Sequence, residues 1–252
     1  MTPYYSDDWV RIYHGDCRDI LPTLPKVDLV LTDPPYGLAY NAGSDMASQR
    51  EAIFQGKANG APRPIANDED EQAAQELLRE VLEAAKPLMH RGACCCCCGG
   101  GGGPKPLFAR WTLMLDEIFD FKQAVVWDKG GLGMGIQFRR SYEFMLIAQK
   151  GSPTHRWNGG KTTSNVWRIP KIIPTINQHP TEKPLDLMGK CIELLSDTGD
   201  TVLEPFMGTA ATLRAAKDLN RKAIGIEIEE KYCEIAAQRM SQEVLDFSEP
   251  RQ

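Results

Sequence analysis

The feature that most constrains the fold of this chain is a series of short apolar runs, each of which ends abruptly in polar or glycine-rich residues. Runs of this kind are typical of strands that are buried on both faces of a parallel sheet. We therefore predict strands at Val10–Tyr13, Val27–Leu31, Ala124–Trp127, Thr201–Leu203 and Ala223–Ile226, with Phe144–Ala148 as a further candidate.

Helical patterns lie between several of these predicted strands. Residues Glu71–Ala85 carry leucine and valine at helical spacing, and Pro184–Leu195 opens with a proline, which the first turn of a helix accommodates. Two further helices are predicted at Thr209–Leu219 and Glu229–Met240. The alternation of strands and helices predicts an α/β fold, in which residues 1–252 form a single domain with a mostly parallel sheet and helices on both faces.

Five consecutive cysteines, Cys94–Cys98, precede a run of glycines. Free cysteine packs as a small hydrophobic residue, so we expect these five to form a small buried strand. A zinc site is the alternative, because Cys94 and Cys97 have the C-x-x-C spacing, but adjacent cysteines lack the separated pairs that build a tetrahedral site. We therefore expect no metal. The other three cysteines are scattered, which does not indicate a disulfide framework and favours a reducing cytoplasm.

The charge of the chain is unevenly distributed. The net charge is −5, but the segment from Lys129 to Lys171 has eight basic residues against one acid, Glu143. Such a segment can hold a phosphate backbone on an acidic protein, and the alternative interpretation is a solvated face. The chain has no run of 18 apolar residues and no basic, apolar start. We therefore expect neither a membrane span nor a secretory signal.

The string Asp33-Pro34-Pro35-Tyr36 directly follows a predicted strand. In open α/β sheets, ligands bind beyond the carboxyl ends of strands, and two prolines make such a loop rigid and extended. The Asp33 carboxylate and the Pro34 carbonyl can accept the two hydrogens of an amino group, and Tyr36 can stack on a ring. These parts suit a flat heterocycle with an exocyclic amino group, although a plain proline turn remains the alternative.

A second constellation lies near the C-terminal end of the sequence. Residues 201–209 read as a strand, a tight turn and a helix start, with Glu204-Pro205-Phe206-Met207-Gly208 in the turn. The next predicted strand ends at Glu227, and an acid at that place can hold two ribose hydroxyls. The two features together favour a nucleoside-binding edge of the sheet.

These motifs together resemble those of the DNA amino-methyltransferases, whose catalytic motif is D-P-P-Y and whose cofactor loop combines an acid, Pro, Phe and a glycine-rich turn. Residues 179–184 resemble the segment that closes over the cofactor in that family. Gly15-Asp16-Cys17 resembles the element in which an aspartate meets the cofactor adenine. Because the catalytic loop precedes the cofactor loop, the order resembles the β-type arrangement, a circular permutation of the Rossmann-like, seven-stranded fold. The resemblance covers roughly residues 9–240.

The resemblance implies S-adenosylmethionine as cofactor and double-stranded DNA as partner. It implies methyl transfer to the exocyclic N6 of adenine after base flipping. Catalytic roles are implied for Asp33, Pro34, Pro35 and Tyr36. Cofactor contacts are implied for Asp16, Cys17, Asp33, Thr181, Lys183, Glu204, Pro205, Phe206, Gly208, Thr209 and Glu227.

Two segments are expected to face the DNA. Residues 129–178 form the expected target-recognition segment, and residues 40–66, rich in Gly, Ala, Ser, Asn and Pro, form a DNA-facing loop. The recognition sequence is not readable from one chain, because direct readout depends on which side chains reach the base edges. A homodimer and a partner restriction nuclease are left open. The expected DNA contacts are Arg139, Arg140, Arg156, Lys161 and Arg168.

Two functional alternatives also stay open. Methylation of cytosine N4 needs the same chemistry, and an aspartate rather than a serine at position 33 favours adenine. The cofactor loop departs from the family's pattern, with Glu204 in place of Asp, and Ala210 and Ala211 in place of Gly and Thr. Alanine lacks glycine's access to positive φ, so we expect a turn of different shape or weaker cofactor binding. A catalytically impaired DNA-binding relative is therefore the second alternative.

Overall fold

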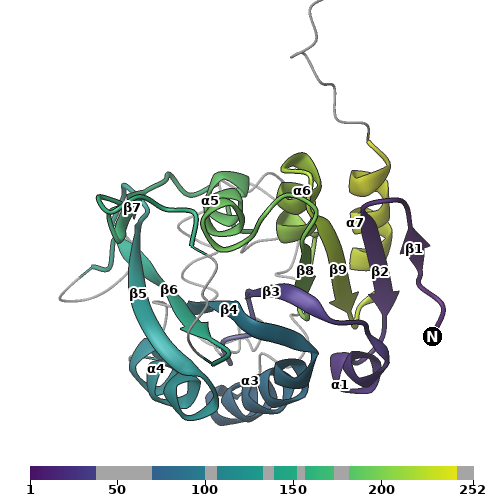
Figure 1. The fold of residues 1–252 in the computed structure, drawn as a ribbon, viewed down its shortest axis with the longest axis horizontal. Coiled ribbons are helices and arrows are strands. Elements are labelled where there is room, and N and C mark those ends of the chain that lie inside the picture. The colour runs from purple at the N-terminus through teal and green to yellow at the C-terminus, as the bar shows by residue number, and fades with distance from the viewer. Residues whose placement is uncertain (38–69, 100–106, 133–138, 152–156, 173–181, 243–252) are drawn as a thin grey trace, which may run out of the picture.

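The computed structural model describes residues 1–37, 70–99, 107–132, 139–151, 157–172 and 182–242. Within these residues the chain forms one mostly parallel, nine-stranded sheet of order β1-β2-β9-β8-β3-β4-β6-β5-β7 (Figure 1). The expected DNA-facing loop at 40–66 lies outside the described residues. The strands are β1 Tyr5–Ser6, β2 Val10–His14, β3 Val27–Thr32, β4 Met89–Gly99, β5 Asp120–Asp128, β6 Tyr142–Gln149, β7 Val166–Arg168, β8 Thr201–Glu204 and β9 Lys222–Glu227.

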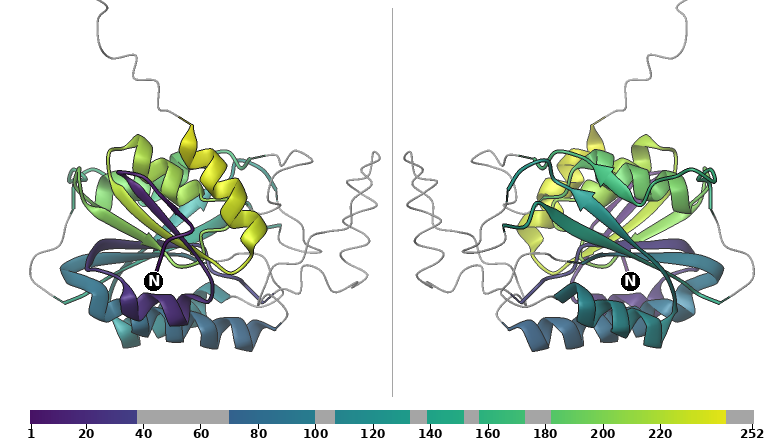
Figure 2. Two further views of the ribbon diagram at one scale, coloured as in Figure 1. Left: turned by 90° about the vertical axis from the view of Figure 1, so that its right-hand side faces the viewer. Right: turned by 90° about the vertical axis from the view of Figure 1, so that its left-hand side faces the viewer.

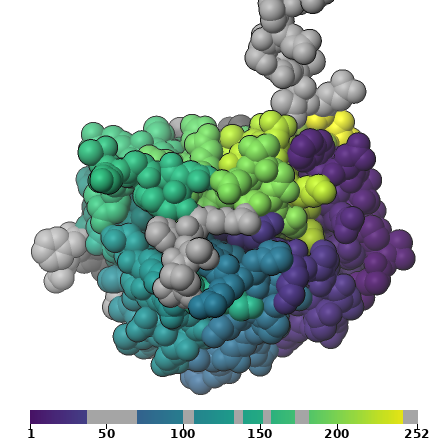
Figure 3. Space-filling view, in the orientation of Figure 1, coloured from purple at the N-terminus to yellow at the C-terminus, as the bar shows by residue number. Residues whose placement is uncertain are grey.

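Four of the predicted strands are consecutive neighbours in the sheet. Strands β2, β9, β8 and β3 pair in parallel, with Val10 and Val202 both beside Ala223, and Leu29 beside Val202. Two of these strands come from the start of the chain and two from its end. The space-filling view shows the purple N-terminal part lying against the yellow C-terminal part (Figure 3). Strands from the two ends of the chain therefore lie side by side in one sheet.

Strand β4 contains all five consecutive cysteines and lies between β3 and β6. Because side chains alternate along a strand, Cys94, Cys96 and Cys98 pack into the core on one face, and Cys95 and Cys97 pack into the core on the other. None of the five is more than 4% exposed. Small apolar side chains suit a strand that is buried on both faces, and the predicted cysteine strand is confirmed.

Helices cover both faces of the sheet, as predicted. The helices α1, α3 and α4 pack on one face, and α5, α6 and α7 pack on the other, which the edge-on views show as two layers (Figure 2). Helix α3 begins after Asp70, whose carboxylate accepts hydrogen bonds from the backbone N–H groups of Gln72 and Ala73 at 2.8 Å. The bounds are α1 Cys17–Ile20, α3 Glu71–Ala85, α4 Leu107–Ile118, α5 Leu185–Leu195, α6 Ala211–Asp218 and α7 Glu230–Ser241.

The prediction of seven strands was wrong, because β1 and β7 add short strands at the two edges of the sheet. These strands have two and three residues, too few for a periodic pattern. Strand β7 lies inside residues 129–178, the expected target-recognition segment, where no strand was predicted after Ala148. Helix α4 was also missed, although its buried residues Leu107, Trp111 and Leu115 follow helical spacing.

The strand directions gather the predicted site residues at one edge of the sheet. Strands β2, β9, β8, β3 and β4 are parallel, so their carboxyl ends lie together, and β5 and β7 end at the same side. We call this side the carboxyl edge. Glu204 and Glu227 end their strands there, and Asp16 and Asp33 follow theirs. No helix within the described parts of the chain is both long and apolar enough to cross a membrane.

Candidate active site

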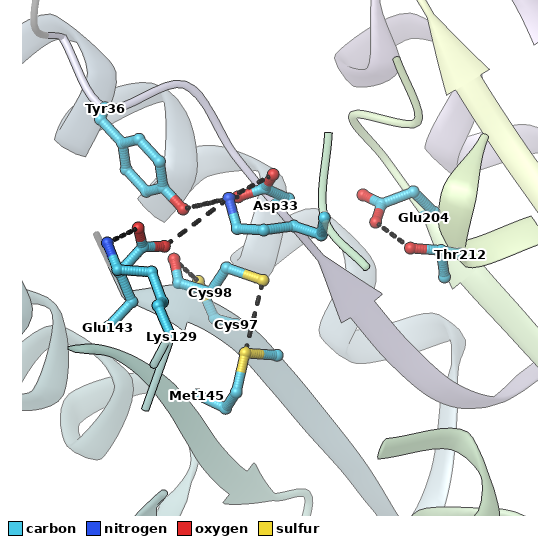
Figure 4. Close-up of polar contacts among 10 residues, drawn as sticks. Asp33, Tyr36, Cys97, Cys98, Lys129, Glu143, Met145, Glu204 and Thr212 are labelled. Atoms are coloured by element: carbon cyan, nitrogen blue, oxygen red, sulfur yellow. Dashed lines mark hydrogen bonds and ion pairs between the residues drawn. The ribbon is translucent and has the colours of Figure 1, made fainter. Parts of the chain in front are cut away.

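Asp33 lies one residue beyond β3 at the carboxyl edge, where Pro34 and Pro35 keep the following chain extended. Its carboxylate accepts a hydrogen bond from the Tyr36 hydroxyl at 2.5 Å and one from Lys183 Nζ to each oxygen at 2.8 Å. The close-up shows the Tyr36 and Asp33 side chains pointing toward each other (Figure 4). The loop therefore presents a carboxylate that accepts both O–H and N–H donors.

Lys183 is buried between two acids. Its side chain is 6% exposed, and its Nζ lies 3.9 Å from Oε2 of Glu143, whose Oε1 accepts a hydrogen bond from Lys129 at 2.9 Å. Burial lowers the pKa of Lys183, but Asp33 and Glu143 outweigh burial and raise that pKa above its ordinary value. Burial raises the pKa of Glu143, but Lys183 and Lys129 bring it below its ordinary value. Lys183 and Glu143 are therefore both charged at neutral pH.

The ring of Tyr36 is fixed by packing. It lies on the indole of Trp111 in α4, with ring centroids 5.5 Å apart and planes 28° apart, and Lys183 Nζ lies 5.3 Å from its centroid. Burial raises the pKa of Tyr36 well above its ordinary value, so the hydroxyl stays protonated and donates a hydrogen bond to Asp33. The sequence did not reveal the contact with Trp111, because that residue belongs to the helix that the prediction missed.

Glu204 ends β8 and holds the following turn. Its side chain is buried, and its carboxyl group accepts hydrogen bonds from the backbone N–H of Phe206 at 3.1 Å and from the Thr212 hydroxyl at 3.0 Å. Burial raises the pKa of Glu204 to about 8, with a smaller contribution from the nearby charge of Asp33. Glu204 therefore ties the turn to the start of α6 and lies next to the loop that follows β3.

The turn after β8 keeps a shape that glycine favours. Gly208 has a φ of 50°, and among the described residues, its chain neighbours aside, no atom lies within 4 Å of the place where a Cβ would stand. Ala210 has a φ of 64° and a ψ of 39°, which is the left-handed region. Ala210 therefore adopts a conformation that alanine disfavours, and the Cβ costs about 1–2 kcal/mol there. The backbone thus retains the left-handed conformation at the position where the family usually has glycine.

Glu227 ends β9 and contacts the same turn. Its carboxylate accepts hydrogen bonds from the backbone N–H groups of Gly208 and Glu229, each at 2.9 Å, and burial raises its pKa. Asp16 lies close by, because the N–H of Gly15 donates to the carbonyl of Glu227 at 2.9 Å. The structure therefore brings Gly208, Glu227 and Asp16 together, as predicted for a cofactor site.

Asp16 and Cys17 have structural roles that the sequence did not reveal. The Asp16 carboxylate caps α1 through the backbone N–H of Arg18 and pairs with the Arg18 guanidinium at 2.6 Å, which lowers the pKa of Asp16. Cys17 is buried, and burial raises the pKa of its thiol to about 12. A thiol of this kind is a packing group rather than a nucleophile.

The turn is also anchored to the segment that precedes α5. The Thr209 hydroxyl donates to Glu182 at 3.1 Å, and Arg239 of α7 pairs with the same carboxylate at 2.8 Å. Arg239 also donates to the Thr209 carbonyl at 3.1 Å. The expected cofactor contact Thr181 lies outside the described residues. Of the segment 179–184, which was expected to close over the cofactor, the structure describes residues 182–184.

Three of the expected DNA contacts lie at the carboxyl edge. Arg168 ends β7 with its side chain 82% exposed, and it pairs at 2.9 Å with Asp128, the last residue of β5. Arg139 and Arg140 lie three and two residues before the start of β6, which pairs with the end of β5. Arg156 lies outside the described residues.

Lys161 is not brought together with these arginines. Three residues before it, Asn158 hydrogen-bonds to the carbonyls of Leu194 and Ser196 at the C-terminal end of α5. That end of α5 leads into the start of β8, so it lies opposite the carboxyl edge. The neighbouring Trp157 is exposed, whereas Trp167 is buried in the core. The segment 129–178 therefore contributes to both ends of the sheet.

The site contains charged residues that the sequence reasoning did not assign. Glu143 and Lys129 complete the network around Lys183, and Glu182 joins the turn to α7. The signal for Glu143 was available, because it is the one acid in a strongly basic segment. Within the ranges that the structure describes, no group of three or more His, Cys, Asp or Glu side chains could hold a metal ion.

The sequence and the geometry together define a DNA methylase with an α/β fold. The family model N6_N4_Mtase, described as DNA methylase, matches residues 27–238, so the chain belongs to this family. The type II methyltransferase M2.DpnII of Streptococcus pneumoniae is 26% identical over 259 residues, covering 96% of this chain and 93% of that protein. The DNA adenine methyltransferase YhdJ of Escherichia coli (strain K12) is 25% identical over 271 residues, covering 94% and 84%.

A solved structure supports the same fold. The crystal structure of the M1.HpyAVI–SAM complex is 24% identical in sequence, covers 92% of this chain and all of that chain, and superimposes with a TM-score of 0.66. The expected α/β methyltransferase fold, with a mostly parallel sheet and helices on both faces, is therefore confirmed.

Proposed function

We propose that this protein is a permuted, β-type DNA amino-methyltransferase, which transfers a methyl group from S-adenosylmethionine to N6 of adenine in double-stranded DNA. The observation that carries this proposal is the meeting of the Asp33–Tyr36 loop with the Glu204–Gly208 turn at the carboxyl edge, on the neighbouring strands β3 and β8. The permuted order is supported because the strand before the proposed catalytic loop comes early in the chain and the strand before the proposed cofactor turn comes late.

The residues at the carboxyl edge fit the proposed cofactor. The space that the described residues leave open at Gly208 lets a ligand approach the backbone, and the carboxylate of Glu227 offers acceptors for ribose hydroxyls. Phe206 is a partly buried ring beside the turn, and Asp16 lies at the end of the neighbouring strand. When bound, this cofactor supplies an electrophilic methyl group attached to a sulfonium.

Asp33 and Pro34 prepare the target amino group. The amino group of adenine is a weak nucleophile because the ring shares its lone pair. Hydrogen bonds from its N–H groups to the Asp33 carboxylate and the Pro34 carbonyl favour a more localised lone pair. The contact of Lys183 with Asp33 supports this role, because it provides two N–H donors at 2.8 Å. Holding the amino group in line with the methyl group supplies much of the rate.

The target base reaches this loop by flipping out of the duplex, which costs a few kcal/mol. The ring of Tyr36 offers a surface on which the base stacks, and its packing on Trp111 holds the ring ready. Residues 129–178 hold the duplex, with Arg139, Arg140 and Arg168 at the carboxyl edge as phosphate contacts. One domain therefore carries the cofactor site, the catalytic loop and the DNA contacts.

Adenine is the proposed target for two reasons. Position 33 is an aspartate rather than a serine, and the relative YhdJ, similar over most of its length, is named as a DNA adenine methyltransferase. Cytosine N4 is the alternative target, because it carries the same kind of amino group and the family model is named for both.

The proposal is tested by tritium transfer from labelled S-adenosylmethionine to unmethylated genomic duplex DNA, followed by digestion and base analysis. We expect N6-methyladenine. Recovery of N4-methylcytosine would move the target to cytosine, and absence of transfer to any DNA would refute the proposal.

Asp33→Asn should nearly abolish transfer while cofactor affinity stays within about twofold of the wild-type value, because Asp33 acts on the amino group and contributes little to cofactor binding. Asparagine is preferred to alanine because removing a partner from the buried Lys183 with no replacement destabilises the fold. The matched control is Asp120→Asn at the exposed start of β5, which should transfer normally. Normal transfer by a folded Asp33→Asn protein would contradict the mechanism.

A further inference from the structure

Lys183 lies where the proposed mechanism needs the target amino group. Its Nζ donates to both oxygens of Asp33 at 2.8 Å and lies 3.2 Å from the Tyr36 hydroxyl. Tyr36 itself donates to one of the same oxygens. A carboxylate accepts along a limited number of lone-pair directions, so the N–H groups of a base have to compete with this ammonium for Asp33.

The structure provides a second anion for the displaced ammonium. Oε2 of Glu143 lies 3.9 Å from Lys183 Nζ, about one ångström beyond hydrogen-bond distance. The two lysines hold Glu143 in its charged form, and its Oε1 is already bound to Lys129 at 2.9 Å. Lys183 lies two residues before α5, and a rotation of its flexible side chain would carry the ammonium over this short distance from Asp33 to Glu143.

Resting on the proposed function, we infer that Lys183 occupies the place of the target amino group until a base enters, and that Glu143 then receives its ammonium. Glu143 is thus a positioning residue, since it acts through Lys183 and has no contact with the reacting atoms. Without this second anion, displacing Lys183 from Asp33 would leave a buried cation with no partner, which is strongly unfavourable. The exchange keeps the charges of the site paired at every stage.

The first test is Glu143→Gln, measured as the single-turnover rate of methyl transfer to unmethylated genomic DNA with saturating S-adenosylmethionine. We expect the rate at pH 7.5 to fall at least about tenfold, with cofactor affinity unchanged. The matched control is Glu117→Gln, an exposed carboxylate of α4 that pairs with Arg79, and it should leave the rate unchanged. A wild-type rate for Glu143→Gln would overturn the inference.

Rescue by charge rather than by shape separates positioning from a merely structural role. Glutamine keeps the shape of Glu143 but not its charge, whereas Glu143→Asp keeps the charge and shortens the side chain. A carboxylate at this position can still receive the ammonium of Lys183, so Glu143→Asp should transfer at least about threefold faster than Glu143→Gln at pH 7.5. A Glu143→Asp rate no higher than that of Glu143→Gln would overturn the inference.

A double substitution gives the second test. If Lys183 blocks Asp33 when the Glu143 carboxylate is missing, the double variant Glu143→Gln, Lys183→Met should transfer at least about fivefold faster than Glu143→Gln alone. If Lys183 instead orients Asp33 permanently, the double variant will be slower than Glu143→Gln, and the inference fails. Thermal melting checks the folding of each variant, and where the double variant is unfolded the comparison of Glu143→Asp with Glu143→Gln alone decides.

The two proposals fail differently. Absence of methyl transfer by the wild-type protein would refute the proposed function, and the inference with it. Normal transfer by the wild type together with an insensitive Glu143→Gln variant would refute the inference alone.

Discussion

Glu204→Gln gives the sharpest test of the electrostatics of the carboxyl edge. The native pKa of Glu204 is about 8, whereas an ordinary glutamate titrates near 4.5. Burial is the main cause, because the side chain is only 1% exposed. The native state therefore keeps a proton that the unfolded chain releases between these two pH values. A raised native pKa stabilises the fold fully below pH 4.5, and this contribution is lost as the pH rises toward 8.

The magnitude follows from the size of that gap. One pH unit of difference between the native and unfolded pKa corresponds to about 1.4 kcal/mol, so the free energy of unfolding contributed by Glu204 falls by at most about 5 kcal/mol between pH 4.5 and 8. Glutamine has nearly the same shape and does not titrate. It can still accept from the Phe206 N–H and meet the Thr212 hydroxyl, so the turn should survive the substitution.

The assay is urea unfolding of wild type and Glu204→Gln across pH 5–8, followed by tryptophan fluorescence. The stability of the variant relative to wild type should increase steadily with pH over this range. Asp7 and Asp16, whose pKa values are lowered, make the free energy of unfolding change with pH in the opposite direction, but they do so equally in both proteins and cancel in the difference. Glu193→Gln, an exposed carboxylate of α5, is the matched control. Parallel curves for wild type and Glu204→Gln would show that this carboxyl ionises normally in the fold.

Three further predictions concern the same edge of the sheet. Glu227→Ala removes the acceptor for two backbone N–H groups, so cofactor affinity should fall at least about tenfold, and unchanged affinity by calorimetry would contradict the assignment. Gly225→Ala should lower stability by about 1–3 kcal/mol in thermal melts, because its Cβ would come within 2.6 Å of Met207 and Leu213; an unchanged melting temperature would contradict this. Arg168→Gln should make the slope of log K for DNA binding against log salt concentration shallower by about 0.9, whereas Lys161→Gln, at the opposite end of the sheet, should not change this slope. A slope for Arg168→Gln equal to that of wild type would remove Arg168 from the interface.

The layers and the central strands were predictable because burial on both faces leaves a continuous apolar run in the sequence. The run at Cys94–Cys98 is the clearest case, since it is unusual in composition but ordinary in its burial. Helix α4 had a readable pattern that the prediction missed. The edge strands β1 and β7 had none, because two or three residues do not establish a period.

The site was predictable in its loops but not in its contacts. Asp33 and Glu227 could be placed at the carboxyl edge, because each follows or ends a recognisable strand. The ion pair of Asp33 with Lys183 joins residues that are far apart in the chain, and no local pattern encodes it. The left-handed Ala210 also contradicts its own residue preference, because the surrounding turn determines the backbone there.

The cysteine strand has a consequence for handling the protein. None of the eight cysteines forms a disulfide and all are buried in the fold, so a thiol-reactive dye should label none of them until the sheet opens. Unfolding exposes them together, and Cys94–Cys98 become five neighbouring thiols on a flexible chain. In air, such a chain can form disulfides within itself and with other copies, and these have no place in the native core. The rate of dye labelling therefore reports the rate at which the sheet opens, and recovery of the fold after denaturation requires a reductant.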